Sequence, residues 1–338
     1  MRKLILLSFL FGLKLFSQAT DFKHISFEKA DNVAKQFNGA SLQNMPILVN
    51  QLTSNLDTDV EKFRAIYTWI CLNIKNDHSN HVLNLRKRKK FQNDTVALQN
   101  WNNQFREKVF RNLKKHKKTI CTGYAYLLQE LSLLAGLNCK MVHGYGRTVA
   151  SNIHELSIPN HSWNVIELNN KWYLTDPTWS SGFFHIDEGY FVANFNDGYF
   201  LTDPELFVKS HYPLESSWKL TRNSFTIEDF LNGPLVYGNA FKYGVKPIGL
   251  SKMKLEVLQN DRLSFRFEVP EDFDINALEL LVGSNSDKSL IEVFQLNSGN
   301  HIVEFENTFK RRGFYDVHLK LGEDLLVTYT VKVLKNKS

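Results

Sequence analysis

The sequence is poor in cysteine, proline and methionine, with three, eight and four residues in a chain of 338. The cysteines and histidines do not follow the spacing of a zinc site, and there is no aspartate-rich loop of the EF-hand type. A glycine-rich loop that could hold phosphate groups is also lacking. We therefore expect neither a metal nor a cofactor.

No low-complexity tract or internal repeat interrupts the chain, of which 43% is hydrophobic and 22% charged. This composition is typical of a globular protein and excludes a solenoid or a disordered chain. Much of the net charge of +6 lies in two basic runs, residues 86–90 and 111–118. Neither run has interleaved aromatic residues or belongs to a nucleic-acid module, so no nucleic-acid partner is expected. An anionic envelope or cell-surface polymer is the weaker alternative.

The longest apolar run lies at the start of the chain, in residues 1–19. It begins with Arg2 and Lys3 and ends with small residues, Ser17 and Ala19, at the spacing that a signal peptidase prefers. Lys14 interrupts the run, which is too short to span a bilayer. We therefore expect a cleaved signal peptide and an extracytoplasmic protein (periplasmic, on the cell surface or secreted) without a transmembrane segment.

Residues 20–230 predict an α+β domain with its core in residues 57–220. Apolar residues recur at helical spacing in two segments, 57–77 and 121–136. Strand patterns follow in residues 139–146, 161–168 and 171–179. The polar and basic segment 76–118 between the two helices is expected to be a surface excursion, with a helix near residues 96–115.

The last third of the chain predicts a second domain made of strands. Glycine and proline accumulate in residues 231–249, which we expect to be a linker. Apolar and polar residues then alternate, as in RLSFRFEV (262–269) and LLVTYTVKV (325–333). Such short strands predict a β-sandwich of the immunoglobulin-like type over residues 250–335.

Cys121 directly precedes the second predicted helix, in the stretch TICTGYAYLLQ. A helix N-terminus stabilises a thiolate, the reactive form of cysteine. Position alone does not make a nucleophile, because small buried residues are common at helix starts. Cys71 and Cys139 are expected to be buried free thiols, with a disulfide between them as the alternative.

A predicted hairpin supplies the partners that a nucleophilic cysteine needs. A turn at Asn169–Asn170 would place Trp163 opposite Asp176, with His161 diagonal to Asp176 on the same face. A carboxylate at that distance can orient an imidazole, which then serves as general base. Trp163 and Trp172 lie on this face as apolar cover. His143 and His154 are weaker candidates for the base, because neither has an acid one short hairpin away.

The motifs CTGYA (121–125), HSWN (161–164) and DPTW (176–179) resemble the core motifs of the transglutaminase-like superfamily, a papain-like cysteine fold. The segment YFLTDPELFVKSHYPLESSWKL (199–220) resembles the branch that includes kyphoscoliosis peptidase and related bacterial secreted proteins. The resemblance implies a helix carrying Cys121 packed on an antiparallel sheet. It also implies a catalytic triad of Cys121, His161 and Asp176, with groove or supporting residues in Trp163, Trp179 and Tyr124.

These residues predict a secreted cysteine enzyme that acts on amide bonds of a protein or peptide through an acyl-thioester on Cys121. Hydrolysis, as in a peptidase, is the favoured outcome, and deamidation or transamidation of glutamine is the alternative. A non-catalytic binding module that retains the fold is a further alternative. The only oxyanion donor that the helix position suggests is the backbone N–H of Cys121.

Overall fold

The computed structural model describes residues 21–149, 158–185, 189–283, 285–287, 290–295 and 301–335. The predicted signal peptide (residues 1–19) and His154 lie outside these residues. Within them, no helix has both the length and the apolar character needed to cross a membrane.

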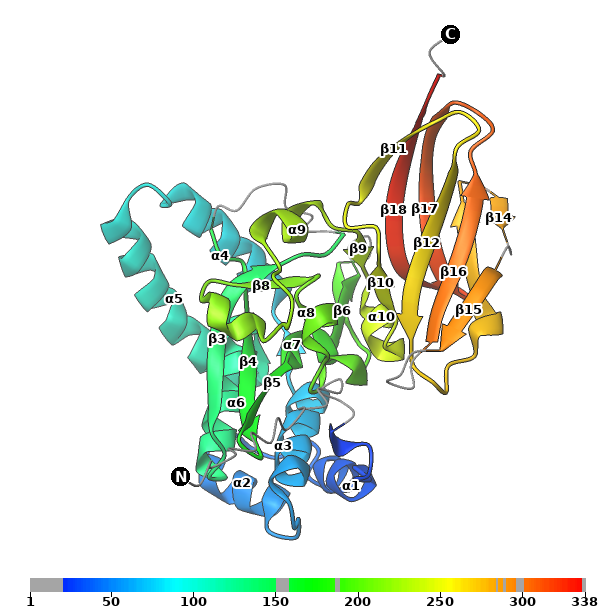
Figure 1. Cartoon of the computed structure of the whole chain (residues 1–338). Coiled ribbons are helices and arrows are strands. Elements are labelled where there is room, and N and C mark those ends of the chain that lie inside the picture. Colours follow the sequence, from blue (N-terminus) through cyan, green and yellow to red (C-terminus); the bar gives the residue numbers. More distant parts are fainter. Residues whose placement is uncertain are drawn as a thin grey trace, which may run out of the picture.

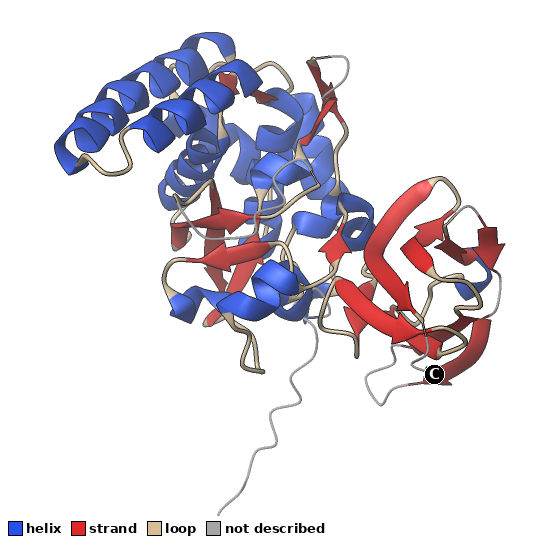
Figure 2. Ribbon diagram, turned by 90° about the horizontal axis from the view of Figure 1, so that it is seen from above, coloured by secondary structure: helices blue, strands red, loops and turns tan. Residues whose placement is uncertain are grey.

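Helices dominate the first part of the chain and strands the last (Figures 1 and 2). The described α-helices are α1 (Glu28–Gln36), α2 (Met45–Thr53), α3 (Asp59–Asn73), α4 (His78–Lys90), α5 (Thr95–His116), α6 (Cys121–Leu134), α7 (Pro177–Ser180), α8 (Pro204–Phe207), α9 (Ile227–Asn232) and α10 (Gly238–Tyr243). The 3-10 helices are η2 (Asp197–Tyr199), η3 (Ser216–Lys219) and η4 (Ile275–Ala277).

The strands of the first part are β1 (Lys75–Asn76), β2 (Lys118–Thr119), β3 (Cys139–Gly146), β4 (His161–Leu168), β5 (Lys171–Thr175), β6 (Gly182–His185), β7 (Tyr190–Ala193) and β8 (His211–Pro213). An antiparallel sheet with the order β5-β4-β3-β8 is the centre of this part. Two short pairs, parallel β1–β2 and antiparallel β6–β7, form separate two-stranded sheets.

Helices α3 and α6 form the core against this sheet. A capping box between Thr58 and Glu61 starts α3, whose buried side chains include Trp69 and Ile70. Helix α6 buries Tyr124, Leu128 and Leu131 at the spacing that the sequence predicts, and it packs on β3 and β4. The pair β1–β2 ties the end of α3 to the residues just before α6, so the core fixes the position where α6 starts.

The hairpin of β4 and β5 has the predicted register. Asn169 and Asn170 form the turn with φ angles of 51° and 59°, a region that asparagine tolerates. Leu168 pairs with Lys171, and Asn164 with Thr175. His161 therefore lies at the start of β4, and Asp176 directly follows the end of β5.

The basic segment 76–118 contains two helices, where the sequence predicted one. Helices α4 and α5 form a pair that projects from the body of the domain (Figures 1 and 2). We call residues 75–118 the basic arm. Its α5 packs through Phe105 and Val109 against Ile120, next to Cys121, whereas α4 has no fully buried residue.

The last part of the chain contains β9 (Leu235–Val236), β10 (Lys246–Ile248), β11 (Lys254–Leu258), β12 (Arg262–Val269), β13 (Leu278–Val282), β14 (Asn285–Asp287), β15 (Leu290–Gln295), β16 (His301–Thr308), β17 (Gly313–Leu321) and β18 (Asp324–Leu334). One sheet has the order β10-β12-β16-β15, and the other has the order β11-β18-β17-β13-β14 with β9 paired to β18. Phe265 of the first sheet meets Tyr329 of the second with ring centroids 5.4 Å apart, so the two sheets pack as a sandwich.

The segment 231–249, expected to be a linker, is folded at the junction of the two parts. It contributes β9 and β10 to the two sheets of the sandwich. Its α10 packs on η2, where the ring of Phe241 stacks on Tyr199 at 4.4 Å. The glycine and proline residues of this segment therefore mark turns between short elements.

Candidate functional site

Cys121 is the first residue of α6, and its preceding residue Ile120 provides no side-chain cap. The first backbone N–H groups of a helix have no intrahelical partner, so they favour negative charge at this point. Cys121 is buried, with 8% of its surface exposed. The thiol thus lies at a helix N-terminus and is shielded from bulk water.

Gly123, two residues after the cysteine, is required by a close contact. A Cβ atom built on Gly123 would lie 1.8 Å from the Oγ1 atom of Thr119. Thr119 is itself buried and fixed in the short strand β2. Only glycine allows α6 to start this close to β2.

We expect Gly123→Ala to lower the free energy of unfolding by about 1–3 kcal/mol, because the added methyl group overpacks a buried contact. Urea denaturation measures this loss. Gly136→Ala, at a position with nothing within 4 Å but a φ of +78°, serves as a comparison for backbone strain without a clash. Unchanged stability of Gly123→Ala would contradict the close contact.

His161 and Asp176 form the pair that the hairpin register predicts. The Nε2 atom of His161 lies 2.7 Å from Oδ2 of Asp176. His161 also interacts with the nucleophile, through a hydrogen bond between its side chain and that of Cys121. The structure therefore brings Cys121, His161 and Asp176 into one connected chain of contacts.

The charges in this group support one another. Burial would raise the pKa of the Cys121 thiol, but the hydrogen bond and the charge of His161 lower it below its ordinary value. Burial likewise disfavours the imidazolium, yet Asp176 and Cys121 together raise the pKa of His161 to about 10. The site therefore favours a thiolate beside an imidazolium, the pairing that activates a cysteine nucleophile.

Asp176 also caps a helix. Its Oδ1 atom accepts hydrogen bonds from the backbone N–H groups of Thr178 and Trp179, at 2.8 and 3.3 Å, and so caps α7. Its side chain is fully buried. Burial would raise the pKa of this carboxyl, but the charge and hydrogen bond of His161 hold it below its usual range. Asp176 is thus fixed and ionised.

A second histidine, His211 on β8, also contacts Asp176. Its Nε2 atom lies 3.2 Å from the Oδ2 atom, and its Nδ1 atom lies 2.9 Å from the Ser210 hydroxyl. Burial lowers the pKa of His211 to about 4, against the opposing effect of Asp176, so this ring is neutral near pH 7. A neutral His211 donates its Nε2–H to Asp176 and accepts from Ser210. His211 was not predicted from the sequence, although HYP (211–213) lies in the segment with family resemblance.

In the described part of the chain, His161, Asp176 and His211 are also the one group whose side chains could together bind a metal ion. The candidate ligand atoms of His161, Asp176 and His211 lie within 4.8 Å of one another. Mutual hydrogen bonds already use the carboxylate oxygen that faces both rings. The arrangement is therefore explained by hydrogen bonding within the group.

The predicted supporting residues have different positions. Trp179 is half-buried and its ring stacks on His161, with centroids 4.8 Å apart. Trp163 is fully buried beside His161 and His211, so it supports the site from inside. Tyr124 is also buried and donates its hydroxyl to the carbonyl of Ile74 at 2.7 Å.

Trp172, which was expected to cover the pair, packs on Trp218 with ring centroids 5.2 Å apart. The aromatic contacts of His161 come from Trp163, Trp179 and His211 instead. The alternation of side chains along β5 predicts the face on which Trp172 lies. It does not predict which end of the strand lies beside the site.

Cys71 and Cys139 are free and buried, as is Cys121. Burial raises the pKa of Cys139 to about 12 and also raises that of Cys71. These two thiols are therefore protonated at neutral pH. Among the three cysteines, only Cys121 has a pKa shifted toward the thiolate.

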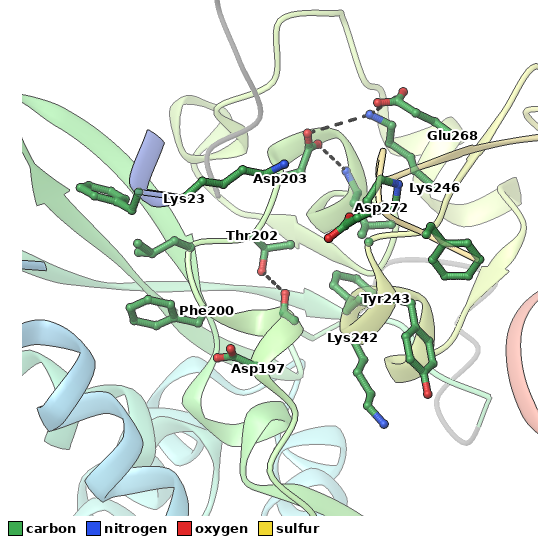
Figure 3. A pocket seen from close by; sticks show the side chains of 18 of the residues that line it. Lys23, Asp197, Phe200, Thr202, Asp203, Lys242, Tyr243, Lys246, Glu268 and Asp272 are labelled. Atoms are coloured by element: carbon green, nitrogen blue, oxygen red, sulfur yellow. Dashed lines mark hydrogen bonds and ion pairs between the residues drawn. The ribbon is translucent and has the colours of Figure 1, made fainter. Parts of the chain in front are cut away.

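A large hollow of about 530 Å³ lies elsewhere, at the junction with the sandwich (Figure 3). Side chains of opposite charge line it, including Lys246, which pairs with Glu268 at 3.0 Å and lies 3.9 Å from Asp203. Cys121, His161 and Asp176 are not among its lining residues. The candidate site is therefore the buried group around Cys121.

Comparison with known proteins finds a family match over part of this chain. Residues 47–177 match the family described as the transglutaminase-like superfamily. Human kyphoscoliosis peptidase is 32% identical over 211 residues, which cover 61% of this chain and 28% of the human protein. Hillarin of Drosophila melanogaster is 26% identical over 236 residues, covering 65% of this chain and 26% of hillarin. The LIM and transglutaminase domain protein ltd-1 of Caenorhabditis elegans is 25% identical over 238 residues, with 65% and 29% covered.

The chain thus spans less than a third of the length of these relatives. The match with the family includes Cys121, His161 and Asp176 in its range. The superfamily and the kyphoscoliosis peptidase branch predicted from the motifs are confirmed, and so is the transglutaminase-like fold of mixed helices and antiparallel sheet.

Proposed function

Because residues 47–177 are a domain of the transglutaminase-like superfamily, whose members are generally enzymes, we propose that this chain is a cysteine enzyme acting on amide bonds. The observation that carries the proposal is the chain of contacts from Cys121 through His161 to Asp176. This arrangement has the three roles that a cysteine nucleophile requires: the nucleophile, the base and the group that orients the base.

The reaction proceeds in two stages. The Cys121 thiolate attacks the amide carbonyl, and the C–N bond breaks as His161 gives its proton to the leaving amine or ammonia. The acyl group then remains on sulfur as a thioester. In the second stage His161 takes a proton from the incoming water or amine, which attacks the thioester and releases the Cys121 thiolate. Asp176 holds the imidazole in place throughout.

The start of α6 is the best position for oxyanion stabilisation. Tyr124 and Gly123 donate their N–H groups to the carbonyl of Ile120. The N–H of Cys121 itself precedes this bonded turn and belongs to the donors that a helix start leaves available. We assign it to the developing oxyanion, where a fixed donor is worth most.

The identity of the second reactant decides the reaction class. Water gives a peptidase or a glutamine deamidase, and a lysine amine gives a transglutaminase. Hydrolysis is the favoured outcome, because two relatives, from human and mouse, bear the name kyphoscoliosis peptidase. We further propose that residues 1–19 direct the protein out of the cytoplasm.

One assay separates these outcomes. N,N-dimethylated casein is incubated with the protein and with monodansylcadaverine, and three products are measured: new N-termini, ammonia and dansyl incorporation. New N-termini that depend on Cys121 support the peptidase. Ammonia release alone or dansyl incorporation would replace it by the deamidase or the transglutaminase. A gelatin digest serves as a second substrate. If neither substrate gives any of the three products, the proposed activity is contradicted and the alternative of a non-catalytic binding module replaces it.

His211 provides a prediction for the same reaction. His211→Phe keeps a ring between Phe207 and Trp179 but removes the N–H that holds Asp176. We expect kcat to fall by about 10–100-fold, since a hydrogen bond to a charged group is worth about 1.5–3 kcal/mol. KM should stay unchanged, because the buried His211 cannot contact substrate.

The matched variant is His211→Gln, which restores an N–H donor and should recover part of kcat. Steady-state kinetics below the unfolding temperature of each variant separate positioning from stability. Equal kcat values in the wild type and in His211→Phe would show that His211 only fills space.

A further inference from the structure

The function proposed above does not use the basic arm, although one face of α4 borders the catalytic group. His78, His81 and Arg88 recur at helical spacing on that face. The ring of His78 stacks on Phe184 of β6, with centroids 3.6 Å apart. Arg88 donates from Nη1 to the carbonyl of Pro159, 2.7 Å away and two residues before His161. Helix α4 therefore packs beside the segment that leads into His161.

The charges that act on the side chains of α4 are consistent with its position beside the catalytic group. Burial lowers the pKa of His81 to about 4, and the charge of His161 acts in the same direction. Burial also lowers the pKa of Arg88, while the charges of Cys121 and Tyr145 oppose that shift. A guanidinium group thus lies within electrostatic range of the nucleophile.

Arg88 has hydrogen-bonding capacity to spare. Its Nε atom is buried and has no partner, and none of its hydrogen bonds or ion pairs in the described part of the chain involves a carboxylate. A partly buried cation without a counter-ion is costly. A carboxylate on a bound ligand would supply both the charge and the acceptor that Arg88 lacks.

The whole arm is strongly positive. Residues 75–118 contain 13 lysines and arginines against 3 aspartates and glutamates, a net charge of +10. The chain total is +6, so all other residues together carry −4. Among the described residues, only one of these cations forms an ion pair, Lys118 with Asp77 at 3.9 Å. Ion pairs within the described residues therefore leave most of this charge uncompensated, and most of it lies on the projecting pair of helices.

We propose that the basic arm selects acidic polypeptide segments as substrates, with Arg88 binding a substrate carboxylate beside Cys121. This inference rests on the proposed function and names the substrate class of the same site. Long-range attraction by the arm raises the rate of encounter, and Arg88 fixes the segment next to the thiol. The positive charge extends from the arm to Cys121, which is the proposed nucleophile for amide bonds. A polypeptide is therefore a better ligand for the arm than a nucleic acid or a polysaccharide.

The test compares two peptide chloromethyl ketones of equal length, one with three glutamates and one with three lysines next to the reactive group. Each alkylates Cys121 when its thiolate displaces chloride, and intact-mass spectrometry gives the rate. Iodoacetamide, which is small and neutral, reports on the thiolate alone. We expect the acidic peptide to react at least about 10-fold faster than the basic one at low salt, within the range that electrostatic steering gives. The ratio should approach one at about 0.5 M salt, where screening is strong.

The arm is tested by reversing four of its exposed charges, Arg86→Glu, Lys89→Glu, Arg106→Glu and Arg111→Glu. The matched control reverses four exposed charges in the sandwich, Lys252→Glu, Lys254→Glu, Lys310→Glu and Arg311→Glu. The arm variant should lose the preference for the acidic peptide and keep the iodoacetamide rate. The sandwich variant should keep both. Arg88→Gln should reduce the acidic-peptide rate more than the basic-peptide rate.

The outcomes separate the two proposals. Ordinary thiol behaviour toward iodoacetamide would contradict the proposed function itself. An activated thiol with equal peptide rates, or with a faster basic peptide, would overturn only the selection of acidic segments. Salt-sensitive retention of the protein on heparin that the arm variant loses, combined with equal peptide rates, would assign the arm to an anionic polymer and would also overturn it.

Discussion

Cys121→Ala should reduce turnover of amide bonds by about 10⁴-fold or more, because no other group in the site can form the thioester. The fold should change little, since the substitution removes one buried sulfur atom without adding bulk. Product formation from dimethylated casein measures the loss, and circular dichroism with thermal unfolding measures the fold.

Cys139→Ala is the matched control for this loss. Cys139 is also buried and has a free thiol, but its pKa is raised, so it is not a nucleophile at neutral pH. We expect this variant to retain activity. Full activity in Cys121→Ala, or equal losses in the two variants, would refute Cys121 as nucleophile.

Asp176→Asn should lower kcat by about 10³–10⁴-fold, the loss expected when an imidazole loses the acid that orients it. The carboxylate accepts from both His161 and His211 through Oδ2 and caps α7 through Oδ1. An asparagine presents an NH2 group either to the two imidazoles or to the helix cap, so one of these sets of bonds is broken. The pKa of His161 should fall toward its ordinary value, because its counter-ion is lost.

Asp203→Asn is a closely matched control. Asp203 also precedes a proline, and it caps α8 through hydrogen bonds from Glu205 and Leu206 at 2.7 and 3.2 Å. None of its partners among the described residues is a histidine. Both variants thus perturb an Asp-Pro helix cap, and only Asp176→Asn should lose activity. Similar kinetics in both would show that Asp176 acts only as a cap.

The sequence predicts the local part of the site well. A two-residue turn of asparagines fixes the register of β4 and β5, and register places His161 and Asp176 on one face. The start of α6 at Cys121 follows from helical periodicity. These features depend on residues close together in the chain, so pattern and turn chemistry suffice to find them.

The rest of the site depends on contacts between distant segments. His211 reaches Asp176 because β8 pairs with β3, and neither strand has a turn that would reveal this pairing. Arg88 reaches the site because α4 folds back over it, although its segment is polar and has no buried stripe. Periodicity predicts faces of elements, whereas the partner of each face is decided by tertiary packing.

The rate of Cys121 alkylation by iodoacetamide against pH, in the wild type and in His161→Ala, tests the central claim most directly. Because His161 lowers the pKa of the thiol, the wild type should react rapidly well below the ordinary cysteine pKa of about 8.5. His161→Ala should lose this low-pH reactivity, and its rate should rise only as an isolated buried thiol ionises at higher pH. Identical profiles in the two proteins, each rising at or above the ordinary pKa, would contradict an activated Cys121–His161 pair.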